Sequence, residues 1–151
     1  MMLIPSMVKL NNPELLRSAS CLDAFGRLAL SASKLIYLDI DDAYIHHLFP
    51  LLNNTEIKKP DYFKEGSVGA HITVAYPEEQ SIFDKKDYGK EYHFKVKELV
   101  VADINLKKYY VLLVESPMLR QLRTKHGLPE QLNFKQHLID FHITIGVSGK
   151  I

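Results

Sequence analysis

The chain has 151 residues, of which 46% are hydrophobic, and this is enough to bury a sizeable core as one domain, 1–151. Its 19 Lys and Arg residues nearly balance its 18 Asp and Glu residues, which argues against a long nucleic acid as the partner. Cys21 is the only cysteine, so an internal disulfide is excluded, and no apolar run approaches the roughly 18 residues of a membrane span. We therefore expect a cytoplasmic protein that acts on a small ligand, with no membrane partner.

The first part of the chain predicts a helix, a strand and a second helix. Asn12 is a suitable N-cap, with proline at the first helical position, and Gly26 is expected to end this helix. Residues 35–40 are rich in β-forming side chains and predict a buried strand. Residues 42–52 place apolar side chains at helical spacing behind an acidic first turn, which favours a helix. A polar loop follows.

The next stretch occurs twice in the chain, as His71-Ile72-Thr73-Val74 and as His142-Ile143-Thr144-Ile145. Successive side chains of a β-strand point to opposite faces, so each His shares a face with its Thr. We expect the first copy on a strand at 67–76, with small neighbours that leave room for a ligand, and the second copy on a strand at 138–147. Tyr76 falls on the opposite face of the first strand and is predicted to lie in the core.

The segment between the two copies predicts more strands and one helix. Residues 78–90 are charged, which is typical of a solvated loop and compatible with a lid. Alternating side chains from 92 to 114 predict strands around a turn near Asn105. Ser116 is expected to cap a helix that ends at Gly127, and a loop leads on to the second copy.

The repetition is the strongest functional signal in the sequence. One His-aliphatic-Thr-aliphatic tetrad is usually an ordinary strand, but two arise by chance in only about one chain in ten thousand of this length. Two imidazoles in one groove can act on a phosphodiester as base and acid, while two hydroxyls hold the phosphate oxygens. The predicted catalytic residues are therefore His71, Thr73, His142 and Thr144.

Asp140 shares the predicted face of His142. It is expected to orient that histidine, or to bind the substrate by accepting a hydrogen bond from a base, or else to be a solvated acid at the start of the strand. The chain has no His-Glu-x-x-His run and no cysteine cluster, so the sequence predicts neither a metal nor another cofactor.

A unit of strand, helix, loop and motif strand occurs at 35–76 and again at 109–147. With its two His-x-Thr tetrads, the chain resembles the 2H phosphoesterases over residues 33–150. The resemblance implies an α+β, bilobal fold in which two antiparallel sheets flank a central groove and the helices lie outside. The implied lobes span about 33–76 and 105–150, after an N-terminal helical segment.

Residues 69–77, GAHITVAYP, look more closely like the phage anti-CBASS phosphodiesterases, which degrade cyclic oligonucleotide signals of bacterial immunity. This resemblance implies a cyclic di- or trinucleotide as the substrate and the host bacterial cytoplasm as the location. It also implies that a ribose 2′-hydroxyl attacks the adjacent phosphorus, although the sequence leaves open which His is the base.

Two alternatives to this function remain at this point. One is a 2H enzyme acting on RNA ends or 2′,3′-cyclic phosphates, which is expected to have a more basic groove. The other is a module that sequesters nucleotides without cleaving them. The nucleobases need aromatic partners, and the sequence leaves four candidates open: Tyr37, Tyr88, Tyr109 and Phe141.

Overall fold

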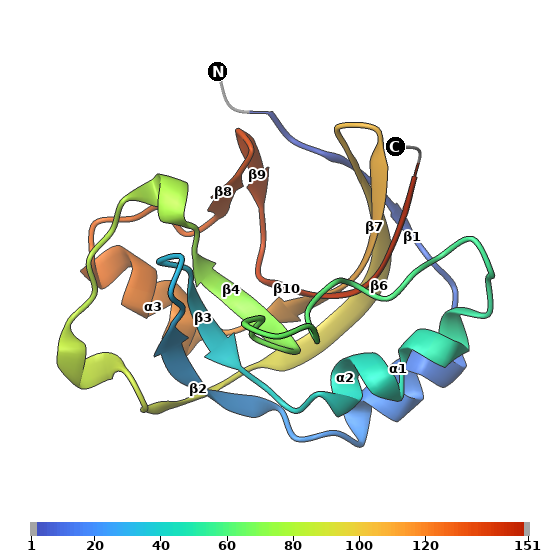
Figure 1. Ribbon diagram of the computed structural model, residues 1–151, viewed down its shortest axis with the longest axis horizontal. Coiled ribbons are helices and arrows are strands. Elements are labelled where there is room, and N and C mark those ends of the chain that lie inside the picture. The colour runs from blue at the N-terminus through green and yellow to red at the C-terminus, as the bar shows by residue number, and fades with distance from the viewer. Residues whose placement is uncertain (1–2, 150–151) are drawn as a thin grey trace.

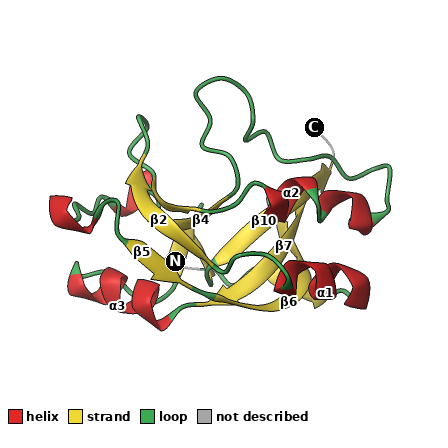
Figure 2. Ribbon diagram, turned by 90° about the horizontal axis from the view of Figure 1, so that it is seen from below, coloured by secondary structure: helices red, strands yellow, loops and turns green. Residues whose placement is uncertain are grey.

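The computed structural model describes residues 3–149. The fold is α+β, as the sequence predicts, with two four-stranded antiparallel sheets, a two-stranded hairpin, and helices at the periphery (Figures 1 and 2). In chain order the elements are β1 Ser6–Lys9, α1 Pro13–Ser20, β2 Phe25–Leu30, β3 Ile36–Asp39, α2 Ala43–His46, η1 Phe49–Leu52, β4 His71–Ala75, η2 Pro77–Glu79, η3 Lys85–Asp87, β5 Glu91–His93, β6 Lys95–Ile104, β7 Lys107–Glu115, α3 Pro117–Lys125, β8 Leu132–Phe134, β9 His137–Ile139 and β10 His142–Gly149.

The two large sheets repeat one plan. Their strand orders are β4-β3-β2-β5 and β10-β7-β6-β1, so each His-x-Thr strand lies at a sheet edge. Each also pairs antiparallel with the strand that opens its own unit, β4 with β3 and β10 with β7. The two edge strands contact each other in the middle of the molecule (Figure 1), which brings the two motifs together.

Each motif strand also contains a register shift at the end of its tetrad. In the first sheet Thr73 pairs with Tyr37 and Ala75 with Ile36, so Val74 is an extra residue. In the second sheet the pairing passes over Ile145 in the same way. A bulge of this kind bends the strand and re-aims the side chains that follow it.

The first two predicted helices are shorter in the structure than in the prediction. Asn12 caps α1 as expected, with its Oδ1 accepting from the Leu15 N–H at 3.1 Å, but the helix ends at Ser20. Gly26 lies within β2, where a Cβ would meet the backbone oxygen of Asp39. The predicted helix at 42–52 is split into α2 and η1, because Pro50 has no N–H to continue the α-helical ladder.

Three strands, β1, β2 and β8, were not predicted. The strand predicted at 67–76 spans only 71–75, and the strand predicted at 138–147 is divided into β9 and β10 at residues 140 and 141. β1 is exposed at every position, so its sequence carries no alternation of buried and exposed residues. The predicted first helix overlaps only the first two residues of β2, and no element was predicted over the rest of this strand. The hairpin of β8 and β9 turns at Lys135 and Gln136, with φ values of 48° and 68°. These residues lack the Asn-Gly signal of such turns.

The predicted helix at 116–126 is confirmed as α3. The Ser116 hydroxyl accepts from the Leu119 N–H at 3.2 Å, and Gly127 follows with a φ of 79°. Its side chains Leu119 and Leu122 enter a hydrophobic core that runs through both sheets. Within residues 3–149 we find no helix that is long and apolar enough to cross a membrane.

A buried ion pair fixes the end of β4. The Arg123 side chain is 0% exposed and lies 2.7 Å from the Glu79 carboxylate, whose side chain is 4% exposed. Arg123 also donates to the carbonyl of the bulge residue Val74 at 2.8 Å. Glu79 in turn accepts from the Tyr76 N–H at 2.9 Å. The pair therefore holds the chain just after the first motif.

Arg123→Met is expected to lower the free energy of unfolding by about 3–5 kcal/mol, because it leaves the Glu79 carboxylate buried without a cation. Chemical denaturation measures the change. The double variant Arg123→Met/Glu79→Gln removes that charge and should recover part of the loss. A single variant within about 1 kcal/mol of the parent would contradict this account.

Candidate active site

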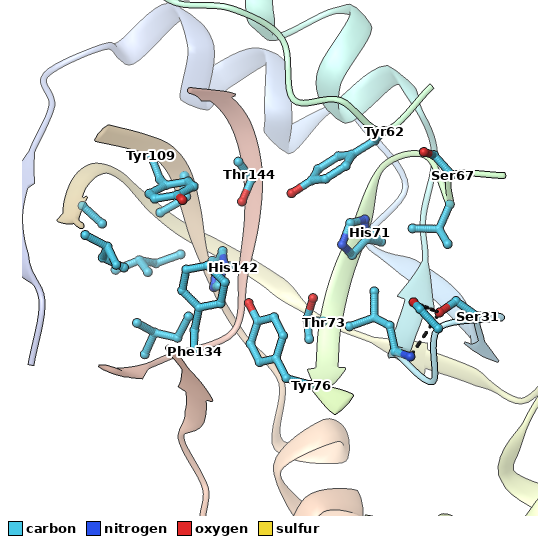
Figure 3. Close-up of a pocket in the computed structure, with 18 of the residues that line it drawn as sticks. Ser31, Tyr62, Ser67, His71, Thr73, Tyr76, Tyr109, Phe134, His142 and Thr144 are labelled. Carbon is cyan, nitrogen blue, oxygen red and sulfur yellow. Dashed lines mark hydrogen bonds between the residues drawn. The ribbon is translucent and has the colours of Figure 1, made fainter. Parts of the chain in front are cut away.

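The two motif strands line a single pocket of about 440 Å³ between the sheets. Figure 3 shows His71, Thr73, His142 and Thr144 gathered around it, as the sequence predicts for the two tetrads. The remaining lining comes from β1, the β2–β3 turn, the loop before β4, the residue that follows β4, β6, β7, and the β8–β9 hairpin. It consists of Met7, Ser31, Ala32, Ser33, Leu35, Tyr62, Gly66, Ser67, Val68, Tyr76, Ala102, Ile104, Tyr109, Val111, Leu113, Phe134 and Ile139.

Both histidines are held in the same way. Nδ1 of His71 lies 2.8 Å from the Gly69 carbonyl oxygen, and Nδ1 of His142 lies 2.8 Å from the Asp140 carbonyl oxygen. A carbonyl oxygen only accepts, so each Nδ1 carries a proton and donates it. The Nε2 atom of each ring is left to gain or lose the proton that chemistry requires.

The surroundings of the two rings differ. His71 is 8% exposed, and the edges of the Tyr62 and Tyr37 rings pack on it at centroid distances of 4.6 and 5.8 Å. Burial lowers the pKa of His71, the Gly69 carbonyl opposes this, and the nearby His142 lowers the pKa further. Burial also lowers the pKa of His142, but both the carbonyl and the carboxylate of Asp140 oppose that effect.

A tyrosine lies near each threonine in the pocket (Figure 3). Thr73 and Thr144 are 5% and 8% exposed, and Tyr76 and Tyr62 line the same pocket. Burial raises the pKa of both tyrosines, so both phenols remain protonated at neutral pH. Four hydroxyl groups therefore lie beside the two imidazoles, and each can donate to a phosphate oxygen.

The prediction that Tyr76 lies in the core was wrong. The bulge at Val74 changes the alternation of the strand, so Tyr76 turns into the pocket, where its ring lies 5.2 Å from that of Phe134 (Figure 3). Of the four candidate aromatic residues, Tyr109 lines the pocket, whereas Phe141 is buried in the core.

Sequence reasoning missed Tyr62 and Phe134. Tyr62 belongs to the polar loop before β4, and Phe134 lies on the unpredicted hairpin. Neither position shows a pattern that marks it, because each enters the pocket through the path of a loop or turn.

The charged segment 78–90, considered as a lid, contributes no residue to the lining.

The pocket has two chemically different ends, with the histidines between them (Figure 3). One end is apolar and aromatic, with Tyr109 and Phe134 in edge-to-face contact at 6.0 Å. The other end carries the hydroxyls of Ser31, Ser33 and Ser67. Among the described residues 3–149, no Lys, Arg, Asp or Glu lines the pocket, and His71 and His142 are the only lining side chains there that carry a positive charge when protonated.

Asp140 lies beside the pocket without lining it. It precedes β10, and its carboxylate accepts from the Gln131 side-chain amide at 3.2 Å in an exposed position. Its backbone carbonyl orients His142. The carboxylate therefore acts on the histidine through its charge, and the substrate contact suggested by the sequence stays a prediction.

Among residues 3–149, Asp84, Asp87 and His126 form a group of possible metal ligands within 4.8 Å of one another, away from the pocket. Lys125 Nζ lies 3.2 Å from both carboxylates, and His126 Nε2 accepts from the Asp84 N–H at 3.1 Å. Ammonium and amide donors already occupy these ligand atoms, which indicates a salt-bridge cluster.

Two sheets that present His-x-Thr edge strands to one pocket define a phosphoesterase with paired histidines. A family model described as "Swiss Army Knife, 2H phosphoesterase domain" matches residues 36–150, and the chain belongs to that family. Its activity is therefore of the phosphodiesterase type. No curated protein and no solved structure gave a significant match to the chain.

Proposed function

We propose that the chain is a metal-independent phosphodiesterase that cleaves 3′-5′ bonds in cyclic di- and trinucleotides, and that a phage uses it to evade CBASS immunity. The observation that carries the proposal is the pocket itself. Two imidazoles with free Nε2 atoms and two threonine hydroxyls line it together, and no Lys, Arg, Asp or Glu of the described part of the chain, 3–149, joins them in the lining.

The proposed reaction uses a ribose 2′-hydroxyl as the nucleophile. His71 Nε2 takes the proton of that hydroxyl, the oxygen attacks phosphorus, and His142 Nε2 protonates the leaving 5′-oxygen. The negative charge of Asp140 supports the protonated form of His142, and burial supports the neutral form of His71. The hydroxyls of Thr73 and Thr144 stabilise the charge that develops on the phosphate oxygens. The product is a 2′,3′-cyclic phosphate, which water can open to a 3′-phosphate.

The lining supports a small cyclic substrate. A long RNA needs several cationic contacts to its phosphates, and no Lys or Arg between residues 3 and 149 lines this pocket. A single phosphodiester carries one negative charge, which one protonated histidine can balance. The aromatic end, with Tyr109 and Phe134, offers ring faces and edges on which a nucleobase can pack.

We expect the purified protein to open a cyclic di- or trinucleotide in the presence of EDTA at an undiminished rate, since the nucleophile belongs to the substrate and no metal-activated water is required. A panel of cyclic di- and trinucleotides, a linear RNA and a 2′,3′-cyclic mononucleotide, with products resolved by mass, measures this. Cleavage of only the linear or 2′,3′-cyclic substrates would favour the RNA-processing alternative. Binding without cleavage would favour a sequestering module, and loss of activity on chelation would contradict the metal-independent reaction.

A further inference from the structure

Asp42 stands at the N-cap position of α2, yet its side chain makes no capping hydrogen bond. Asp and Asn are favoured at this position because their side chains accept from the first free N–H groups of a helix. Here Asp41 takes that role, with its Oδ1 accepting from the Ala43 N–H at 2.9 Å. The Asp42 carboxylate is therefore available for a partner elsewhere.

That partner is the peptide unit that holds His71. Asp42 Oδ1 accepts from the Ala70 N–H at 3.0 Å. The carbonyl of the same peptide unit belongs to Gly69, and it accepts from His71 Nδ1 at 2.8 Å. A carboxylate, one peptide group and an imidazole thus form a continuous chain of hydrogen bonds.

Gly69 makes this close approach feasible. Its φ is +73°, and a Cβ added at this position would lie 2.6 Å from Asp42 Oδ1. Only glycine adopts this backbone conformation freely and also leaves space for the carboxylate. Gly69 is thus constrained by its close contact with Asp42.

We propose that Asp42 is a positioning residue for His71, which it orients and makes more basic through the Gly69–Ala70 peptide. The consequence for catalysis rests on the proposed phosphodiesterase function, whereas the consequence for the imidazole does not. Hydrogen bonds in series polarise one another, so a negative charge at the N–H makes the carbonyl a stronger acceptor. A stronger bond at Nδ1 holds the tautomer with a free Nε2 and stabilises the imidazolium that forms when His71 accepts a proton.

The two histidines differ in this respect. Within residues 3–149, no side-chain carboxylate is hydrogen-bonded to the Phe141 N–H, which belongs to the peptide unit that orients His142. The support through a peptide is therefore specific to His71. The titratable groups around His71 are Tyr37 on β3, Tyr62 in the preceding loop and His142 on β10. Asp39, on β3, pairs with His71 in the strand register.

The test is Asp42→Asn, which keeps a side-chain acceptor and removes the charge. Asp41→Asn is the matched control, because it removes the same charge one residue away without touching Ala70. Nitrogen NMR of the imidazole rings in the free protein should show, for Asp42→Asn only, a lower pKa of His71 and more of its Nε2–H tautomer. The His142 signals should stay as in the parent.

Kinetics on the cleaved substrate supply a second readout. We expect kcat to fall about tenfold in Asp42→Asn, by analogy with the roughly 10–100-fold losses that follow removal of the hydrogen-bond partners of metal-bound histidines. KM should be unchanged. The acidic limb of the pH profile of kcat/KM should move to lower pH, because this limb reports the pKa of the base, His71. An unchanged His71 titration, or equal changes at His71 and His142, would overturn the proposal. The NMR result stands even if no cyclic nucleotide is cut, so failure of the proposed function is separately visible.

Discussion

A cyclic dinucleotide whose 2′-hydroxyl beside the scissile bond is replaced by hydrogen or methoxy is expected to bind and to remain uncut. Under the proposed function, Thr73 and Thr144 contact the phosphate and the aromatic end of the pocket packs on the base, so the analogue should lose little binding affinity. The change removes the nucleophile itself. We therefore expect enzymatic cleavage of this bond to be abolished, a larger effect than the roughly 10²–10⁴-fold decrease in rate from losing one general acid or base.

A ring with one deoxyribose and one ribose provides the internal control for this experiment. The bond beside the remaining 2′-hydroxyl should open and give a linear product that ends in a 2′,3′-cyclic phosphate or a 3′-phosphate. The bond beside the deoxyribose should stay intact. If both bonds opened equally fast, or if products carried a 5′-phosphate, water would be the attacking group and the roles given to His71 and His142 would be wrong.

The two motif copies occupy equivalent places in unequal surroundings. His71 and His142 start edge strands of matching sheets, and each donates from Nδ1 to the carbonyl two residues earlier. His71, however, packs against the rings of Tyr62 and Tyr37, whereas His142 lies near the Asp140 carboxylate. Acid–base catalysis needs one histidine protonated and the other neutral. Different environments favour different protonation states of the two imidazoles.

The sequence predicted the central part of this arrangement. Alternation along a strand placed each His with its Thr, and the repeated unit implied that both motif strands occupy matching positions. The fold class was implied by the resemblance to the 2H phosphoesterases that this repeat carries. The α3 helix was also predictable, because Ser116 and Gly127 are strong local signals at its two ends.

The remainder depends on interactions that local patterns do not contain. The bulge at Val74 turns Tyr76 into the pocket, and the contacts that hold it come from Arg123, 49 residues away in sequence. Tyr62 and Phe134 reach the site on a loop and a hairpin whose paths are set by tertiary packing. Gly26 is typical of a helix end in the sequence. In the structure it lies within β2, where a Cβ would collide with the backbone oxygen of Asp39.

His71→Ala and His142→Ala are each expected to lower kcat about 10²–10⁴-fold while the protein remains folded. Both groups act on one transition state, so the double variant should be little slower than the slower single variant. Rates on a cyclic dinucleotide, together with thermal unfolding, provide the measurement. Thr73→Val is a useful comparison, because it removes one hydroxyl from the same strand and leaves both imidazoles in place.

The pH dependence gives a stricter test of the same pair. The base must be neutral and the acid protonated, so kcat/KM should follow a bell centred midway between the pKa values of the two histidines in the free enzyme. Burial lowers the pKa of both His71 and His142. The maximum should therefore lie on the acidic side of about 6.5, the ordinary value for histidine. Near-parental turnover in either alanine variant, or a maximum well above neutrality, would exclude a mechanism in which these two imidazoles exchange the protons.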